Sequence, residues 1–133
     1  MADNETVQAS WITYLKSKTA LTALLTNGGA NEIRESQWQG DDFAYPAVRI
    51  SMDYMPSVID CFDSVDAIID VFSEQKSSKE AAHIAATLLG LLHNQQINDG
   101  TTNSWHIHVE RIDRPIRDMY AWKASLKVNA LVV

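Results

Sequence analysis

The chain has little of what disulfide frameworks and disordered linkers are built from. Its 133 residues include one cysteine, three prolines and five glycines. The lone Cys61 cannot form an intrachain disulfide, which fits a reducing cytoplasm. Because proline and glycine are scarce and no segment is of low complexity, we expect disorder only in the first few residues, 1–5.

The chain also lacks a long hydrophobic run. Its longest nearly apolar stretch, residues 84–92, is too short to span a bilayer and is interrupted by Thr87 and Gly90. The N-terminus, MADNETVQ, is acidic and has no apolar core of a signal peptide. We therefore expect a soluble protein with no membrane partner.

Basic residues are outnumbered: 11 Lys and Arg face 17 Asp and Glu, for a formal net charge of −6. Proteins that bind nucleic acid specifically carry a basic stripe that neutralises phosphates and releases counterions. The composition argues against such binding, although DNA can still pass close to an acidic surface without being held.

No catalytic motif is present. The pair Gly28-Gly29 is not followed by the Gly-Lys-Ser/Thr of a phosphate-binding loop, and no G-x-S-x-G nucleophile motif occurs. Cys61 lies between Asp60 and Asp63, whose carboxylates oppose formation of a reactive thiolate. The sequence predicts a protein that is not an enzyme and needs no cofactor.

What the chain does have is a clear order of elements. With 46% apolar residues, it is long enough for one domain over residues 1–133 with its own core. Helical spacing predicts a first helix from Asn4, and the S-x-x-E capping box of Ser77 and Glu80 predicts a second major helix reaching Asn94. Alternation predicts strands near residues 33–38, 48–52, 65–72, 105–110 and 122–130. The expected fold is α+β: a largely antiparallel sheet of about five strands with helices packed on one face, in the order α-β-β-β-α-β-β.

The strand over residues 65–72 is apolar on both faces. Val65, Ala67, Ile69 and Val71 share one face, while Ile68 and Phe72 lie on the other with two aspartates. This pattern favours a central strand whose second face is partly covered by a neighbouring molecule.

One constellation permits a metal site. On a strand, His106, His108 and Glu110 share a face, and two imidazoles with a carboxylate suit zinc or iron. The same pattern is typical of a solvent-facing strand side, and no fourth ligand has a telling spacing. We expect no metal site, and keep a small metal-binding domain as the minor alternative.

The stretch from Arg111 to Asp118 carries three arginines and two aspartates around Pro115. Proline removes a ladder donor, which suits an edge or a bulge. Arginine is favoured at interfaces because its planar guanidinium can donate two parallel hydrogen bonds to a carboxylate. The stretch is a candidate subunit contact.

Several segments resemble the tail-completion, or tail-terminator, proteins of long-tailed bacteriophages. They are SWITYLKSKTALTALLTNGG, the proline-led strand YPAVRISMD, the passage VDAIIDVFSEQKSSKEAAHIAATLLGLLHN, and the closing pair of strands. The resemblance covers about residues 6–131 and is strongest where the strand runs into the helix.

That resemblance implies a structural virion protein of the tail, assembled in the host cytoplasm. It implies a homo-oligomeric ring, usually of six subunits, that caps the tail tube and joins it to the head connector or stopper protein. Genome DNA would pass through the channel. The family supplies no active residues, so the interface candidates come from this sequence: Trp38, Phe43, Met55, Phe62, Arg111, Arg114 and Arg117. Another head–tail connector or assembly module remains the main alternative.

Overall fold

The computed structural model describes residues 4–26, 29–35, 45–55, 64–98, 104–117 and 121–132. The helices in this part are α1 (Asn4–Lys16), α2 (Thr19–Thr22) and α3 (Lys79–Leu92), with a 3₁₀ turn η1 (Gly29–Glu32). The strands are β1 (Ile33–Glu35), β2 (Ala47–Met55), β3 (Ser64–Ser73), β4 (Gln96–Asn98), β5 (Ser104–Ile112), β6 (Ile116–Arg117) and β7 (Trp122–Val132). None of the described helices has the length and hydropathy needed to cross a membrane.

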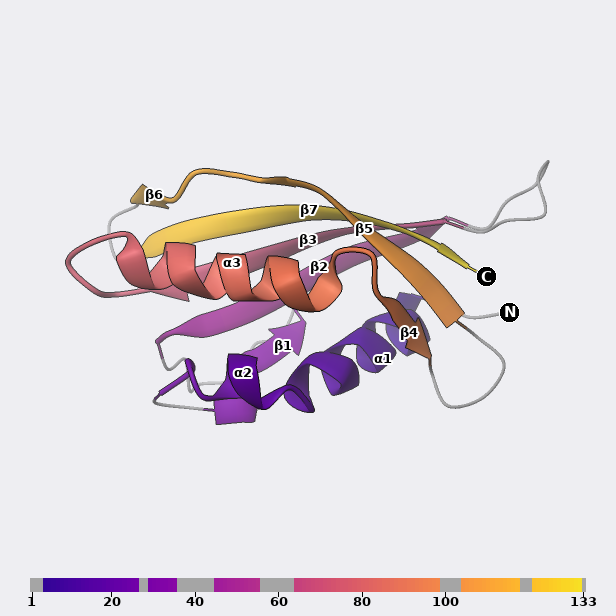
Figure 1. Cartoon of the computed structure of the whole chain (residues 1–133), viewed down its shortest axis with the longest axis horizontal. Coiled ribbons are helices and arrows are strands. Elements are labelled where there is room, and N and C mark those ends of the chain that lie inside the picture. Colours follow the sequence, from indigo (N-terminus) through magenta and orange to yellow (C-terminus); the bar gives the residue numbers. More distant parts are fainter. Residues whose placement is uncertain are drawn as a thin grey trace.

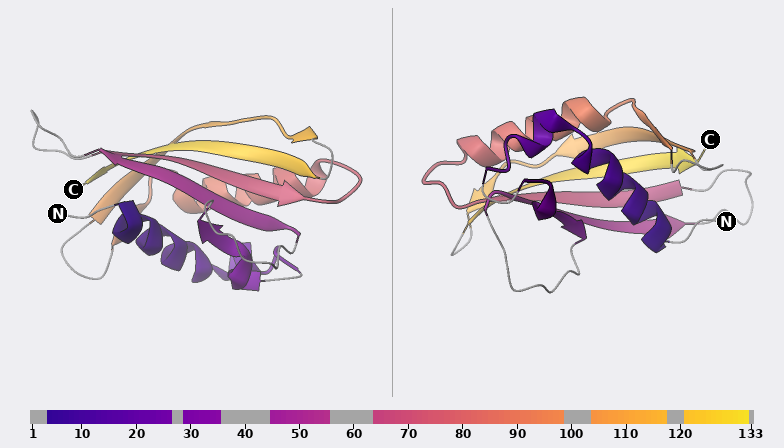
Figure 2. Two further views of the ribbon diagram at one scale, coloured as in Figure 1. Left: turned by 180° about the vertical axis from the view of Figure 1, so that it is seen from behind. Right: turned by 90° about the horizontal axis from the view of Figure 1, so that it is seen from below.

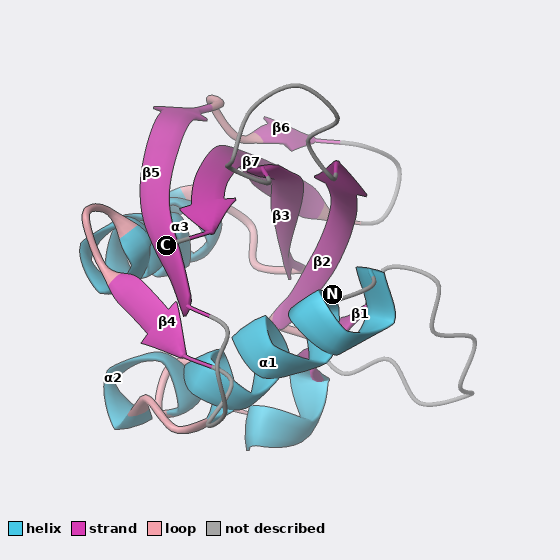
Figure 3. Cartoon of the chain, turned by 90° about the vertical axis from the view of Figure 1, so that its right-hand side faces the viewer, coloured by secondary structure: helices cyan, strands magenta, loops and turns pink. Residues whose placement is uncertain are grey.

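The seven described strands form one sheet in the order β1-β2-β3-β7-β5-β4, with β6 pairing to β7. β1 runs parallel to β2, and the other described pairings are antiparallel. Seen along the strands, the sheet curls over α1 and α3 (Figure 3). The long strands β2, β3, β7 and β5 form a central platform, and the short strands β1, β4 and β6 lie at its margins (Figure 1).

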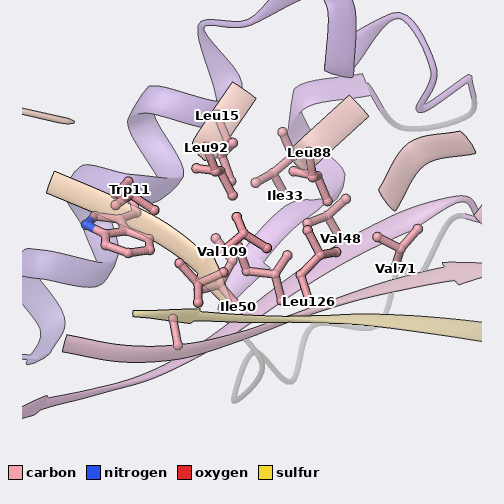
Figure 4. Close-up of a cluster of buried hydrophobic side chains, with 14 of the residues drawn as sticks. Trp11, Leu15, Ile33, Val48, Ile50, Val71, Leu88, Leu92, Val109 and Leu126 are labelled. Carbon is pink, nitrogen blue, oxygen red and sulfur yellow. The ribbon is translucent and has the colours of Figure 1, made fainter. Parts of the chain in front are cut away.

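The core lies between the sheet and the helices. Figures 1 and 2 show α1 and α3 on the same side of the sheet, where their apolar stripes meet its inner face. Trp11 and Leu15 of α1 and Leu88 and Leu92 of α3 are fully buried, together with inward residues such as Leu126 of β7 (Figure 4). Burial of this apolar surface is the main force that holds the helices on one face.

The α+β class, the helices on one face and the antiparallel pairing of the last two long strands are confirmed. The count of about five strands is wrong, since the described sheet has seven. The order α-β-β-β-α-β-β omitted β4 and β6, which have three and two residues. Elements this short show no alternation, so their pairing partners define them rather than their own pattern.

The first predicted helix is present as α1, and where it begins lies outside the described residues, since residue 4 is the first of them. The expected capping box of α3 is wrong. The N-cap is Ser78, with no side-chain capping bond, and the hydroxyl of Ser73 donates to Glu80 Oε1 at 2.7 Å. Because the end of β3 places Ser73 beside the first turn of α3, Glu80 ties strand to helix instead of closing a box with Ser77.

A buried ion pair fixes the parallel edge of the sheet. Arg49 of β2 and Glu32 of η1 are 5% and 3% exposed. Arg49 Nη2 lies 3.1 Å from Glu32 Oε2, and Arg49 Nη1 donates to the carbonyls of Glu32 at 2.6 Å and Val48 at 3.0 Å. The guanidinium therefore joins η1, and with it β1, to the central platform.

Candidate subunit interface

Residues 111–117, here called the arm, leave the sheet where β5 ends and return to it as β6. The N–H of Asp113 donates to the carbonyl of Ser125 at 2.8 Å. Ile116 and Arg117 then pair with Lys123 and Trp122 of β7. The backbone of the arm is thus held against the first residues of β7, at the left-hand end of the sheet in Figure 1.

The side chains of the arm project into solvent. Ile112 and Ile116 are 40% and 67% exposed, and Arg111, Arg114 and Arg117 are exposed as well. Arginine is enriched at interfaces, so exposed arginines beside exposed isoleucines make the arm a candidate contact surface. All three arginines that the sequence singled out are exposed on this segment, and their place in an interface stays a prediction.

Two of the three arginines have contacts within the chain. Arg111 Nε lies 3.0 Å from Asp113 Oδ1, in a pair whose side chains are 63% and 44% exposed. Arg117 Nη1 donates to the carbonyl of Gln75 at 3.3 Å, and its guanidinium lies 5.8 Å from the centre of the Trp122 ring. Among the described residues, the Arg114 guanidinium has no ion-pair partner. Exposed ion pairs of this kind contribute little to the free energy of unfolding. These arginines can therefore exchange their present contacts for new ones at small energetic cost.

Beside the arm, the helix-free face of the sheet holds an open hollow of about 440 Å³. Ile68 of β3 lines the hollow, and Asp70, Arg111, Lys123 and Lys127 contribute charged groups. Lys123 Nζ lies 3.9 Å from Asp70 Oδ2, and Lys127 Nζ lies 4.0 Å from Glu110 Oε2. The hollow and the arm form one continuous surface, because Arg111 belongs to both.

The helix-free face is polar with apolar side chains set into it. Ser125 Oγ donates to Asp70 Oδ1 at 2.6 Å, and Asn129 Nδ2 donates to Asp66 Oδ1 at 2.7 Å. Ile68 is 48% exposed on this face. The predicted central position of β3 is confirmed, since it lies between β2 and β7, with one face buried and Ile68 exposed on the other. What covers the outer face stays a prediction.

The other interface candidates are less informative. Trp38, Phe43 and Phe62 lie outside the described residues, and Met55 is the last residue of β2. The sequence reasoning missed Ile68, Lys123 and Lys127 as members of a shared surface. Their alternation along β3 and β7 was visible, but the register that places Ile68 opposite Lys127 was not.

The geometry does not favour the metal alternative. Glu110 is exposed in the same alternation as His106 and His108, but its carboxylate pairs with Lys127 Nζ at 4.0 Å. His106 and His108 are exposed on β5. Within the part of the chain that the structure describes, no three His, Cys, Asp or Glu side chains are grouped as metal ligands.

His93 lies close to β5, but its imidazole already takes part in a hydrogen bond with the backbone. Its ring centre lies 4.9 Å from that of His108, and its Nδ1 accepts a hydrogen bond from the N–H of Val109 at 3.1 Å. A neutral imidazole that accepts at Nδ1 carries its proton on Nε2, so it offers no lone pair to a metal. His93 instead satisfies a backbone donor at the edge of β5.

No protein-family model matches the sequence, and no curated protein is significantly similar to it. Solved structures do share the fold. One is a chain from the virion of a native gene transfer agent particle, with a TM-score of 0.73 and 16% sequence identity, covering 95% of this chain and 93% of the other. A second, whose name states no function, has a TM-score of 0.70 and 12% identity over 100% of this chain and 97% of its own. At sequence identities this low, the similarity to these two structures shows a shared fold only.

Proposed function

We propose that this chain is a structural protein of a long-tailed bacteriophage or related virus-like particle and serves as its tail terminator. In this role it forms a ring, expected to have six subunits, that caps the finished tail tube and joins it to the head connector or stopper protein. DNA passes through the channel without specific binding. The chain acts in the virion tail after assembly in the host cytoplasm and performs no catalysis.

The observation that carries this proposal is the likeness to the gene transfer agent virion chain. It extends over 95% of this chain and 93% of the other, so it concerns the whole described architecture rather than one common motif. The sequence resemblance to tail-terminator proteins rests on different information, namely residue patterns over about residues 6–131. Two independent likenesses to phage-type particles support a structural role.

The surface described above also supports assembly. A ring of identical subunits needs side-chain surface that is exposed in the single chain and buried in the assembly. The arm supplies this with Ile112, Ile116 and three arginines, next to a hollow on the helix-free sheet face. The acidic composition agrees with a channel that lets DNA pass without holding it.

The first test is the native mass of the purified protein, measured by light scattering over a concentration series. We expect a species of six times the 14.9 kDa chain mass. A pull-down with the tail-tube protein and, separately, with the connector protein then distinguishes a terminator from a connector. Binding to the tube protein is expected of a terminator. A chain that binds only the connector, or neither protein, contradicts the proposed role.

A further inference from the structure

The arm and the hollow have a specific occupant: we propose that they bind residues 56–63 of a second copy of this chain, in a head-to-tail contact. The inference deepens the proposed function, since a ring is closed by such contacts, and rests on it in that respect.

The charge of the receiving surface is opposite to that of the whole chain. Five basic residues lie on the arm and around the hollow, against three acidic ones, whereas the chain carries a net charge of −6. The basic residues are Arg111, Arg114, Arg117, Lys123 and Lys127, and the acidic ones are Asp70, Glu110 and Asp113. A surface with a basic excess on an acidic chain favours an acidic partner, and a second copy is such a partner.

Residues 56–63 have the matching chemistry. Their sequence, PSVIDCFD, contains two aspartates and no basic residue, together with Val58, Ile59 and Phe62. The receiving surface offers arginine and lysine heads around the exposed Ile68 and Ile116. The aspartate carboxylates of the segment would bind the guanidinium groups, and its apolar side chains would pack on the isoleucines. This combination of charged and apolar contacts is common in protein–protein interfaces.

The arm and the residues that flank segment 56–63 lie at opposite ends of the sheet. β2 ends at Met55 and β3 begins at Ser64, and these residues pair with each other and lie beside Leu131 near the end of β7. The arm lies beside the other end of β7, at Trp122 and Lys123. Since β3 has ten residues, these ends are about 30 Å apart at roughly 3.3 Å per residue.

A chain cannot place this segment on its own arm. Residues 56–63 must leave β2 and return to β3, so they reach outward at most half their extended length, about 14 Å. Contact with the arm must therefore be made between two copies. Ile68 of the hollow is only four residues, or about 13 Å, from Ser64, so the arm is the part that requires a second copy. Complementary surfaces at opposite ends of one molecule give a heterologous contact, which closes into a ring when the rotation between copies permits.

The segment between β1 and β2 is the nearest rival. Residues 36–44 also carry two aspartates, with Trp38 and Phe43. However, they lead into β2 at Ala47, which pairs with Phe72, and Phe72 pairs with Lys123 beside the arm. This end of the sheet is the arm's own end, and Ala47 lies two strand spacings, or about 10 Å, from Lys123, so a contact with residues 36–44 would not need a second copy.

Cys61 allows a direct test in the native chain, because this single cysteine lies in the proposed occupant. A thiol-reactive photo-cross-linker on Cys61 should give intermolecular products in which peptides containing residues 111–117 carry the link. The matched control is Cys61→Ser/Thr13→Cys, which moves the probe to an exposed position on α1 and should not label those peptides. Links from Cys61 to other surfaces, or none, overturn the inference.

Charge exchange provides the second test. Arg114→Glu/Arg117→Glu and Asp60→Lys/Asp63→Lys should each weaken self-association more than about tenfold, because each sets like charges against each other. Mixing the two variants should restore assembly, since the altered arm then meets the altered segment. Circular dichroism spectra like that of the wild type show that the variants are folded. Failure of the mixture to assemble, or undiminished assembly of either variant alone, contradicts the pairing.

The outcomes separate this inference from the proposed function. A wild-type ring whose Cys61 links map elsewhere removes the pairing and leaves the terminator role standing. A wild-type monomer without links also removes it, while capture by the tail-tube protein still supports the role. If the wild type binds fluorescent duplex DNA at low salt and Arg114→Glu/Arg117→Glu does not, a nucleic acid occupies the surface and the inference is overturned.

Discussion

The buried pair of Arg49 and Glu32 makes the stability of the sheet edge testable. Arg49→Met keeps the apolar stem and removes the guanidinium. It leaves the Glu32 carboxylate, in a residue only 3% exposed, without its ion-pair partner. The carbonyls of Glu32 and Val48 lose a donor in the same step.

The expected cost is large because a buried charge is left uncompensated. Breaking such a pair from one side costs about 3–5 kcal/mol, a large part of the roughly 5–15 kcal/mol that stabilises a typical domain. Replacing both partners, in Glu32→Leu/Arg49→Met, removes the stranded charge. The double variant should therefore recover at least about 2 kcal/mol relative to Arg49→Met.

Urea denaturation followed by tryptophan fluorescence measures these differences, since the chain has four tryptophans. All variants are compared at one protein concentration, because self-association adds to apparent stability. Lys76→Met is the control: it removes an exposed cation from a turn and should change the free energy of unfolding by no more than about 0.5 kcal/mol. An Arg49→Met variant within about 1 kcal/mol of the wild type would refute the reasoning.

Three further predictions concern the packing and the hydrogen bonds. Leu88→Ala should lower the free energy of unfolding by about 2–5 kcal/mol in the same denaturation assay, because Leu88 is fully buried. Leu131→Ala, at a residue that is 46% exposed, should lower it by only about 0.5 kcal/mol. Equal costs would contradict the assigned core. Ser73→Ala should lower the free energy of unfolding by about 1 kcal/mol, because its hydrogen bond to Glu80 is lost. Ser77→Ala should lower it by less. The reverse order would support the capping box of Ser77 and Glu80. The Tyr14 phenol donates to the carbonyl of Leu91 at 2.8 Å, and burial raises the pKa of this phenol. Its contribution to the free energy of unfolding is therefore present below pH 10 and is lost as the pH rises through the raised pKa. Urea denaturation from pH 8 to 11 should show a steeper loss of stability for the wild type than for Tyr14→Phe, and parallel curves would contradict this.

The long elements could be predicted from the sequence because each carries its own period. β3 shows its inner face in Val65, Ala67, Ile69 and Val71, and all four are buried. The spacing of Trp11 and Leu15 likewise placed the stripe of α1 on the core. Patterns of period two and 3.6 report local geometry and burial together, which is why they transfer directly to the structure.

Features that depend on partners distant in sequence could not be predicted. Arg49 alternates with the apolar Val48 and Ile50, a pattern typical of a solvent-facing position, yet Arg49 is only 5% exposed. Its partner Glu32 is 17 residues earlier and reaches it only because β1 joins β2 in parallel. The β-bulge at Glu110 of β5 is of the same kind, since it is defined by the register with β7 and not by the residues around it. The arm was predicted as a bent segment with an interface role, but its place beside the hollow follows from β6 pairing with β7.

The way the arm is held decides how its substitutions can be read. Its position depends on the backbone bond from Asp113 to the Ser125 carbonyl and on the pairing of Ile116 with Lys123, neither of which needs an arginine side chain. Ser125 itself lies opposite Asp70, which lies opposite Arg49, so one register row connects the arm to the buried ion pair across the central strands. Reversing the charge of Arg114 therefore leaves this support intact. Weakened assembly in such a variant would report on the contact between copies, because the arm would still be where the wild type has it.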